Sequence, residues 1–216
     1  MKYGVIITAG GTSSRFGNTN KLIEKIYDKE VIEYTVEAFI TAKIESIVIC
    51  AHKTLLEHFE ELFKKYENVI VIEGGATRQE SVYKGLQKVN CDYVLIHDGA
   101  RPLISQEIID DVKKSVVEKK AISVMTKTTD TIKEVDETGK IIKTLDRSKL
   151  YNTQTPQAFE YSLIKSVHEK LIGGNYTDDA GMVEIIGNDV YIVNGDPKNI
   201  KITTRSDIEF VKEFLK

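Results

Sequence analysis

The chain has 216 residues, 41% hydrophobic and 29% charged, a composition that is typical of a packed globular protein and excludes a disordered chain, a collagen and a coiled coil. With 30 basic and 33 acidic residues the net charge is −3, and no segment combines clustered basic residues with aromatic ones, so we expect no nucleic-acid partner. No apolar stretch approaches the roughly 20 residues that span a bilayer, so we expect a cytoplasmic protein without membrane contact.

In the first half of the chain, short apolar runs alternate with helical patterns. The runs are rich in β-branched residues, as strands covered on both faces are, and they span residues 3–8, 46–50, 69–72 and 93–96. Apolar residues recur at the helical period over residues 32–40, 55–66 and 79–89. Strands separated by helices favour right-handed crossovers. We therefore predict an α/β fold with a mainly parallel, Rossmann-like sheet sandwiched by helices.

Residues 129–146 break this alternation, because two apolar runs flank a polar turn at 136–139. This pattern predicts a β-hairpin. It falls between a strand at 121–125 and a following helix, so we expect an arm at about residues 128–150, projecting from a single domain that spans residues 1–216. Projecting apolar residues need cover, which favours a homodimer formed through the arm. The alternative is a hairpin packed on its own subunit.

The C-terminal part returns to the α/β pattern. Its periodicity predicts helices at 161–170 and 178–186, a strand at 190–193 and a last helix. Ser206 and Glu209 have the spacing of a capping box, so we expect that box to open the last helix.

A glycine-rich loop, AGGTSSRFGN at residues 9–18, follows the first predicted strand, and Lys21 comes shortly after it. Five residues separate Gly11 from Gly17 and Asn18 follows, so the loop is not a Walker loop. No helical pattern opens directly after it, so it is not a dinucleotide fingerprint either. We interpret it as an extended phosphate-binding loop at the carboxyl end of the strand; the alternative is a mobile turn.

Asp98 follows the predicted strand at 93–96, one residue after His97. The carboxyl ends of parallel strands meet at one edge of a sheet, so this carboxylate is expected to face the glycine-rich loop. Mg²⁺ is usually held by one or two carboxylates together with substrate phosphates, which makes Asp98 a candidate ligand. The alternative is that Asp98 caps the next helix. We expect the neighbouring His97 to form local hydrogen bonds rather than to act as a catalyst.

A third polar string, GGATRQES at residues 74–81, follows the third predicted strand. Thr77 and Glu80 have capping-box spacing, so part of the string is a helix start. A helix cap does not explain Gly75, Arg78 and Ser81. A glycine lets the backbone approach a flat ring closely, and a serine hydroxyl can hydrogen-bond to the edge of that ring, so binding of a flat ring would account for these residues.

Arginine is rare in a chain that is otherwise rich in lysine. The planar guanidinium binds phosphate or carboxylate through two parallel hydrogen bonds, so each arginine is a candidate anion-binding residue. All of them lie in or beside strings rich in Gly, Ser, Thr or Pro. They are Arg15, Arg78, Arg101, Arg147 and Arg205.

Together these strings resemble one family, the 2-C-methyl-D-erythritol 4-phosphate cytidylyltransferases. The matching pieces are AGGTSSRFG, EGGATRQESV, VLIHDGARP, TDTIKEVDETGKIIKTLDRSKLYNTQTPQAF, YTDDAGMVE and GDPKNIKITTRSD. They occur in the family's order and cover nearly the whole chain. The first loop is one residue longer than the usual family loop, and Asn20-Lys21-Leu22 stands where the family has Pro-Lys-Gln. The family's HDAARP is HDGARP here.

The resemblance implies a reaction between CTP and 2-C-methyl-D-erythritol 4-phosphate that gives 4-diphosphocytidyl-2-C-methyl-D-erythritol and pyrophosphate. It implies nucleotide-binding residues at Ala9, Gly10, Gly11, Gly75, Ser81 and Asp98. It also implies Asp98 as the Mg²⁺ ligand. The catalytic, phosphate-handling cations that it implies are Arg15, Lys21 and Lys201.

For the acceptor, a sugar-alcohol phosphate, the resemblance implies binding by Arg101, Thr131, Arg147, Thr155 and Thr177. In the family the arm residues serve the partner subunit's active site, which assigns Thr131 and Arg147 to the other protomer of a homodimer. From the residues alone, without the resemblance, we would interpret Lys201 as a solvated residue at the start of a strand and Arg147 as a surface charge of the arm. Arg78 and Arg205 receive no role.

Other functions stay open at the level of sequence. A ribitol-5-phosphate cytidylyltransferase would share the nucleotide and metal sites and differ only in the acceptor pocket. A non-catalytic nucleotide-binding module would bind CTP without releasing pyrophosphate. An NAD-dependent oxidoreductase is disfavoured because the dinucleotide fingerprint is missing.

Overall fold

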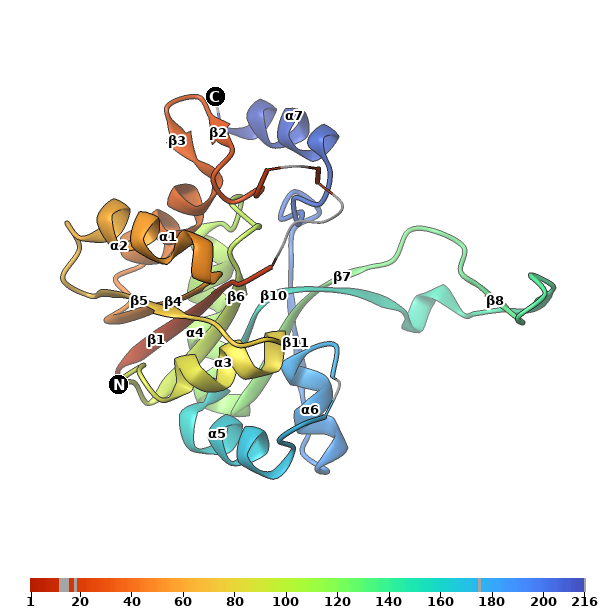
Figure 1. Cartoon of the computed structure of the whole chain (residues 1–216). Helices are drawn as coiled ribbons and strands as arrows, with labels where there is room; N and C mark the ends of the chain where they lie inside the picture. The colour runs from red at the N-terminus through yellow and green to blue at the C-terminus, as the bar shows by residue number, and fades with distance from the viewer. Residues whose placement is uncertain (12–15, 18, 175, 216) are drawn as a thin grey trace.

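The computed structural model describes residues 1–216 except 12–15, 18, 175 and 216. Its centre is a seven-stranded sheet with the strand order β11-β7-β10-β6-β1-β4-β5 (Figure 1). The strands of this sheet are β1 (Tyr3–Ala9), β4 (Ser46–Ala51), β5 (Val69–Glu73), β6 (Tyr93–Asp98), β7 (Ala121–Lys127), β10 (Tyr151–Glu160) and β11 (Tyr191–Asn194). Parallel pairs join β1 to β4 and β6, β4 to β5, and β7 to β11, so the prediction of a mainly parallel sheet is confirmed.

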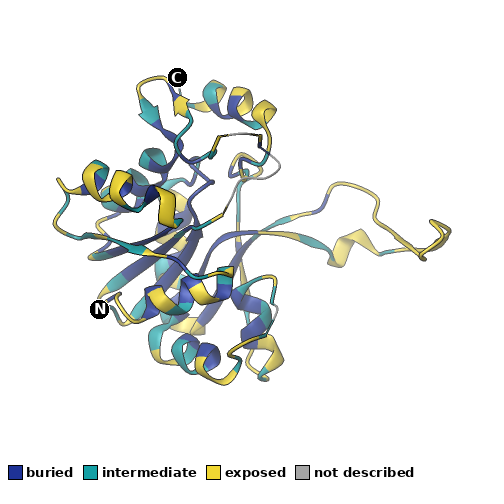
Figure 2. Ribbon diagram, in the orientation of Figure 1, coloured by how far each residue is buried: buried dark blue, intermediate teal, exposed yellow. Residues whose placement is uncertain are grey.

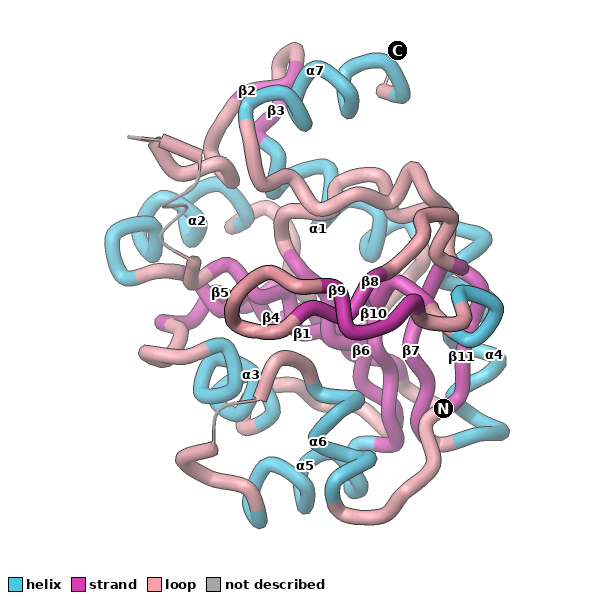
Figure 3. The backbone as a smooth tube through the Cα atoms, turned by 90° about the vertical axis from the view of Figure 1, so that its right-hand side faces the viewer, coloured by secondary structure: helices cyan, strands magenta, loops and turns pink. Residues whose placement is uncertain are grey.

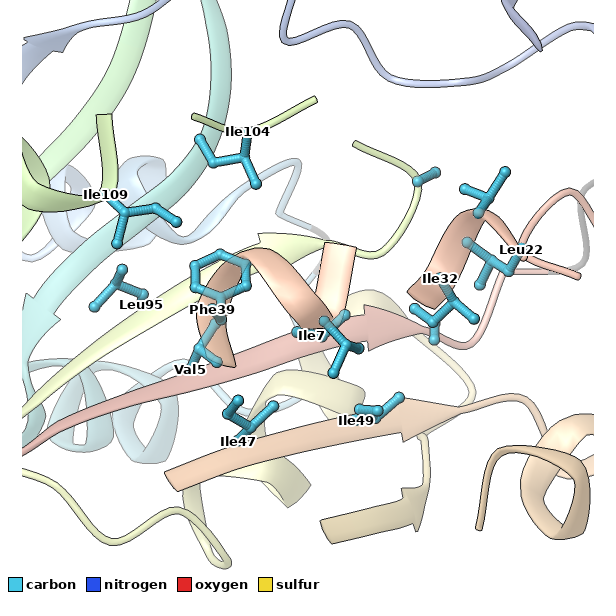
Figure 4. Close-up of a cluster of buried hydrophobic side chains, with 14 of the residues drawn as sticks. Val5, Ile7, Leu22, Ile32, Phe39, Ile47, Ile49, Leu95, Ile104 and Ile109 are labelled. Atoms are coloured by element: carbon cyan, nitrogen blue, oxygen red, sulfur yellow. The ribbon is translucent and has the colours of Figure 1, made fainter. Parts of the chain in front are cut away.

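Helices cover both faces of the sheet (Figures 1 and 3). They are α1 (Val31–Thr41), α2 (Leu56–Phe63), α3 (Arg78–Leu86), α4 (Gln106–Lys119), α5 (Tyr161–Lys170), α6 (Asp179–Ile185) and α7 (Arg205–Phe214). One buried cluster joins α1, α2 and α4 to the sheet, and a second cluster joins α3, α5 and α6 to its other face. Val5 and Ile7 of β1 point into the first cluster, which Figure 4 draws around Phe39, and Ile6 points into the second.

Alternation along the central strands produces these two cores, because successive side chains point to opposite faces. The prediction that strands are covered on both faces is correct for β1, β4 and β6, which are almost entirely buried. It is wrong for β5. This strand lies at the edge of the sheet, and Ile70 is 46% exposed.

The longest strand, β10, is absent from the sequence-based prediction. It runs antiparallel to both β6 and β7 and carries the polar run Gln154-Thr155-Pro156-Gln157, all of it buried. The expectation that the arm lies between a strand and a helix is therefore wrong, because β10 separates the arm from α5. The arm extends the β7–β10 pair, since the Thr128 N–H donates to the Leu150 carbonyl at its base.

The projecting arm is confirmed as a hairpin that leaves the body of the molecule (Figure 1). Its strands β8 (Lys133–Val135) and β9 (Ile141–Thr144) pair antiparallel, and every residue in them is exposed (Figure 2). The Asp136 carboxylate accepts hydrogen bonds from the N–H groups of Thr138 and Lys140 and so holds the turn. A short 3₁₀ helix, η2 (Arg147–Lys149), ends the arm.

The remaining elements differ from the prediction in small ways. A second small hairpin, β2 (Lys25–Ile26) with β3 (Lys29–Glu30), precedes α1, and a 3₁₀ turn, η1 (Lys53–Leu55), precedes α2. The last helix is capped by Thr204 and Asp207, whose carboxylate accepts from the Thr204 N–H, so the Ser206–Glu209 box was misplaced by two residues. Among the residues described here, no helix is long and apolar enough to cross a membrane.

Candidate functional site

A cavity of about 430 Å³ opens at the carboxyl ends of β1 and β6. Its volume is in the range of small-molecule sites. Four separate stretches line it: the glycine-rich loop with Lys21, the string after β5, the end of β6, and the segment before α7. The lining residues are Thr8, Ala9, Gly10, Gly11, Phe16, Lys21, Leu22, Gly75, Ala76, Thr77, Arg78, Ser81, Asp98, Ala100, Lys201 and Thr203.

Asp98 is the anionic residue of this cavity. As the last residue of β6 it lies beside Thr8 of β1, whose hydroxyl donates to its Oδ1 at 3.3 Å. The Lys201 Nζ lies 2.9 Å from its Oδ2. Burial alone would raise the pKa of Asp98, but the positive charges of Lys201, Arg78 and Arg101 outweigh burial and hold it below its ordinary value. The predicted carboxylate therefore faces the loop and is ionised.

His97 lies directly behind this carboxylate and is fully buried. The Asp98 N–H donates to the Thr155 hydroxyl, which lies 3.1 Å from His97 Nδ1, and His97 Nε2 lies 3.2 Å from the Arg101 carbonyl. A neutral ring with its proton on Nε2 satisfies all of these groups. Burial lowers the pKa of His97 to about 4, so it stays neutral at physiological pH and its role is local hydrogen bonding, as predicted.

Two lysines from distant parts of the chain meet at the cavity wall. Lys21 Nζ donates to the Ile202 carbonyl at 2.6 Å, and the Ile202 N–H in turn donates to the Ala100 carbonyl at 2.8 Å. These contacts hold the segment that carries Lys201 against Lys21, just after the glycine-rich loop. Lys201 lies in a loop rather than at a strand start, and its side chain is 43% exposed, so its ammonium is accessible from the cavity.

The string after β5 forms a compact turn into α3. Thr77 caps the helix by accepting from the Glu80 N–H, as its spacing predicts, but the Glu80 carboxylate accepts from the Ala76 N–H and does not complete a capping box. The Ser81 hydroxyl donates to the Thr77 carbonyl and accepts from the Gly75 N–H. A Cβ added to Gly75 would lie 2.2 Å from the Glu80 Cβ, so close packing on α3 requires glycine there. The turn thus holds the Gly75 backbone at the cavity wall. Its contact with the ring of a nucleotide stays a prediction.

Comparison with known proteins assigns this chain to a family. The family model described as IspD, 2-C-methyl-D-erythritol 4-phosphate cytidylyltransferase, matches residues 3–216. The chain belongs to this family. It is therefore an enzyme, a cytidylyltransferase of the nucleotidyltransferase class.

Named relatives and solved structures of this cytidylyltransferase family match over almost their full length. The 2-C-methyl-D-erythritol 4-phosphate cytidylyltransferase of Clostridioides difficile is 41% identical, over 99% of this chain and 93% of the relative. The enzyme of that name from Dictyoglomus thermophilum is also 41% identical, over 97% and 95%. A crystal structure of 4-diphosphocytidyl-2C-methyl-D-erythritol synthase from Anaerococcus prevotii is 31% identical, with a TM-score of 0.89 and coverage of 99% and 96%.

The residues that the cytidylyltransferase resemblance assigns to the nucleotide and to catalysis lie together where the structure describes them. Ala9, Gly10, Gly11, Lys21, Gly75, Ser81, Asp98 and Lys201 all line the one cavity. Arg15 lies outside the described residues.

The acceptor residues are divided between two places. Arg101 and Thr155 are buried directly beneath the cavity: Arg101 Nε lies 3.5 Å from Asp98 Oδ2, and its Nη1 donates to the Asn199 carbonyl at 2.7 Å. Thr177 is exposed just before α6. Thr131 and Arg147 are exposed on the arm, where Arg147 donates to the Thr129 carbonyl, and neither lines the cavity of its own chain.

Several cavity residues of this cytidylyltransferase were missed or left without a role by sequence reasoning. Arg78 lines the cavity. Arg205 does not line it, but its guanidinium lies 5.4 Å from the ring centre of Phe16, which does, and close to Glu24. The rarity of arginine gave a signal for both. Lining residues without such a signal are Thr8, Phe16, Leu22, Ala76, Ala100 and Thr203.

Proposed function

We propose that this protein joins CTP and 2-C-methyl-D-erythritol 4-phosphate to form 4-diphosphocytidyl-2-C-methyl-D-erythritol and pyrophosphate. One observation carries the proposal: in a chain of this family, Lys21, Lys201 and Asp98 come from three separate stretches and line one cavity together with the glycine-rich loop. Cations with backbone amides suit a triphosphate, and Asp98 suits its metal ion.

In the proposed reaction an oxygen of the acceptor phosphate attacks the α-phosphorus of CTP. The new P–O bond forms as the bond to the bridging oxygen between the α- and β-phosphates breaks, and that oxygen leaves with pyrophosphate. A phosphate monoester has a second pKa near 6, so the attacking oxygen is already largely deprotonated at neutral pH. No general base is needed, which agrees with the buried, neutral His97 beside the cavity.

The chain's own contribution to this step is charge neutralisation and positioning, which dominate catalysis of phosphoryl transfer. We assign Lys21 and Lys201 to the phosphates, because both line the cavity and Lys201 is partly exposed there. Arg15 keeps the same role as a prediction from the family resemblance. Arg101 and Thr155 fix Asp98 from below through its carboxylate and its N–H.

Asp98 fits the proposed Mg²⁺ cofactor. Within the described residues no group of three or more His, Cys, Asp or Glu side chains could hold a metal by itself. Mg²⁺ does not require one, because it is commonly bound by one or two carboxylates with the substrate phosphates as further ligands. Bound to Asp98, the ion would neutralise charge on the triphosphate. Lys201, which pairs with Asp98 here, would then be available to the substrate phosphates.

We further propose that two chains form a homodimer through the arm and that Thr131 and Arg147 complete the acceptor site of the partner subunit. Both residues are exposed and lie outside the cavity of their own chain. The arm also exposes apolar side chains, with Ile141 58% and Ile142 56% exposed. Such side chains are usually covered in the assembled protein.

The proposed location is the cytoplasm, a reducing compartment. Cys50 and Cys91 are free thiols, and burial raises the pKa of each to about 12. Unreactive free thiols of this kind suit a compartment in which disulfides do not form.

An acceptor panel tests the function directly. The purified protein is incubated with CTP, Mg²⁺ and one acceptor at a time, and pyrophosphate release is measured. We expect release with 2-C-methyl-D-erythritol 4-phosphate and little with ribitol 5-phosphate. The reverse preference would assign the alternative cytidylyltransferase, and CTP binding without release for any acceptor would indicate a non-catalytic module. Saturable NADH binding would favour the oxidoreductase instead.

A further inference from the structure

Arg78 begins α3 at the wall of the cavity, and its side chain is 27% exposed. Its Nη1 donates to Oδ2 of Asp179 at 2.6 Å. Among the described residues, Asp179 is the one side chain that accepts a hydrogen bond from this guanidinium. A guanidinium has five N–H donors, so Arg78 retains donors for a ligand in the cavity.

Asp179 is completely buried and is held from several sides. Its Oδ1 lies 2.9 Å from Nε2 of His168, a residue of α5 that is also fully buried. The N–H groups of Asp179 and Ala180 donate to Gln157 Oε1 of β10 at 3.0 and 3.1 Å. Burial would raise the pKa of Asp179, but Arg78 and His168 outweigh it and lower that pKa. Asp179 is therefore a fixed anion behind Arg78.

The same contacts join the two halves of the proposed active site. Gln157 also donates through Nε2 to Asp178, the neighbour of Thr177, and it lies two residues after Thr155 on β10. Arg78 belongs to the string that holds Gly75 and Ser81 at the cavity. Asp179 thus connects the segment assigned to the acceptor with the wall assigned to the nucleotide.

Stability alone is a weak reason for such a pair. A buried ion pair contributes little net stability compared with apolar residues of the same volume, because both charges lose their hydration. Moreover, Arg78 is the partner that reaches the cavity, while Asp179 and His168 stay behind it. From the cavity towards the core, the order is Arg78, Asp179, His168. Such an arrangement is typical of a binding residue that is held in place by buried positioning residues.

We propose that Asp179, backed by His168, is a positioning residue that fixes the guanidinium of Arg78 at the cavity wall, where Arg78 binds an oxygen of the nucleotide. The inference rests on the proposed nucleotide site and extends it to a residue pair whose members lie on different helices. Its prediction is that Asp179 acts on CTP through Arg78 and not independently.

The test is a double-mutant cycle with Arg78→Gln, Asp179→Asn and the double variant. CTP affinity is measured by calorimetry without acceptor, and KM and kcat are measured by pyrophosphate release. We expect each single variant to weaken CTP binding and raise KM for CTP about 10-fold or more, the range for a hydrogen bond to a charged group, with a smaller change in kcat. The double variant should bind CTP no more weakly than Arg78→Gln alone, because coupled residues are not additive.

The matched control is Glu30→Gln. Glu30 is also a buried carboxylate that accepts from a histidine, His58, at 2.9 Å, but it does not line the cavity. We expect this variant to lose stability and to keep its affinity for CTP. The inference is overturned if Asp179→Asn lowers the melting temperature but leaves CTP affinity within about 2-fold, or if the two single effects add fully.

Two further measurements keep the test decisive. If Asp179→Asn does not fold, His168→Gln replaces it in the cycle, because it withdraws the support behind Asp179 without removing the carboxylate; an unchanged CTP affinity then overturns the inference.

CTP binding by the wild-type protein separates this inference from the proposed function. A wild type that binds CTP but transfers nothing to 2-C-methyl-D-erythritol 4-phosphate refutes the acceptor assignment and leaves the binding cycle intact.

Discussion

The cavity and the arm depart in opposite ways from the usual rule that apolar side chains are buried and charged ones are exposed. In the cavity a carboxylate is buried: the side chain of Asp98 is only 9% exposed and lies beside Lys201 and Arg101. On the arm, apolar side chains are exposed, with Val135 at 52% and Ile141 at 58%. Buried charge and exposed apolar surface are both unfavourable in an isolated chain. Each feature agrees with the partner that we propose for its region, a polyanionic ligand for the cavity and a second chain for the arm.

The largest expected effect tests the cavity half of this comparison. We expect Lys201→Ala and Lys21→Ala each to reduce turnover by about 10²–10³-fold at saturating CTP and Mg²⁺, the loss typical of one well-placed stabilising donor. Pyrophosphate release measures the effect, and thermal melting checks the fold. Lys198→Ala is the matched control, because Lys198 lies three residues from Lys201 outside the cavity lining. Near wild-type turnover in Lys201→Ala or Lys21→Ala would remove that lysine from the mechanism.

Mixed dimers test whether the two regions belong to one active site. If Arg147 acts on the partner subunit, mixing inactive Lys201→Ala with inactive Arg147→Ala protein creates one intact site in each mixed dimer. Random exchange of subunits should then restore about a quarter of wild-type activity. Activity is measured after the two variants have been unfolded and refolded together, with each variant refolded alone as the control. If Arg147 served its own chain, mixing would restore nothing.

The arm half of the comparison is tested by its apolar surface. We expect the double variant Ile141→Asp, Ile142→Asp to weaken dimer formation by about 100-fold or more, because burial of each isoleucine is worth roughly 1.5–3 kcal/mol and about 1.4 kcal/mol is tenfold. Sedimentation velocity over a range of concentrations measures the change. Lys140→Asp introduces the same side chain one position away, at an exposed polar residue, and should leave the dimer intact. A wild-type protein that sediments as a monomer at all concentrations would contradict the arm-mediated dimer.

Local sequence patterns were sufficient to predict the early strands and the sheet edge at which the cavity forms. β1, β4 and β6 are continuous apolar runs, and the rule that parallel strands end at one edge places Asp98 opposite the first loop. The Thr77 cap followed from spacing alone. These features depend on residues close together in the chain.

The features that were missed depend on distant residues. β10 carries Gln154, Thr155 and Gln157 and contains a proline, so its composition opposes a buried strand. Its polar side chains are buried because partners such as Asp179 and His97 hydrogen-bond to them. The Arg78–Asp179 pair joins residues 101 positions apart, and no periodicity in the sequence encodes it. Tertiary hydrogen bonds therefore override local propensity where the site is built.

The last expected effect is on stability alone and concerns the neutral histidine beneath the cavity. The pKa of His97 is about 4 in the folded chain, against an ordinary value of 6.5. Between these values the unfolded chain binds more protons than the folded one. The contribution of His97 to stability is therefore fully present above pH 6.5 and is lost as the pH falls towards 4. The total loss from this residue is about 3 kcal/mol.

Urea unfolding at a series of pH values measures this dependence. We expect His97→Gln to be less stable than wild type at pH 7, because the contacts with Thr155 and the Arg101 carbonyl are disturbed. Between pH 6.5 and 4, however, its unfolding free energy should fall less steeply than that of wild type. Above pH 7 the two slopes should agree, which serves as the internal control. Parallel curves over the whole range would show that His97 is not kept neutral by burial, and a proton-binding group that the proposed chemistry does not use would then lie beneath the cavity.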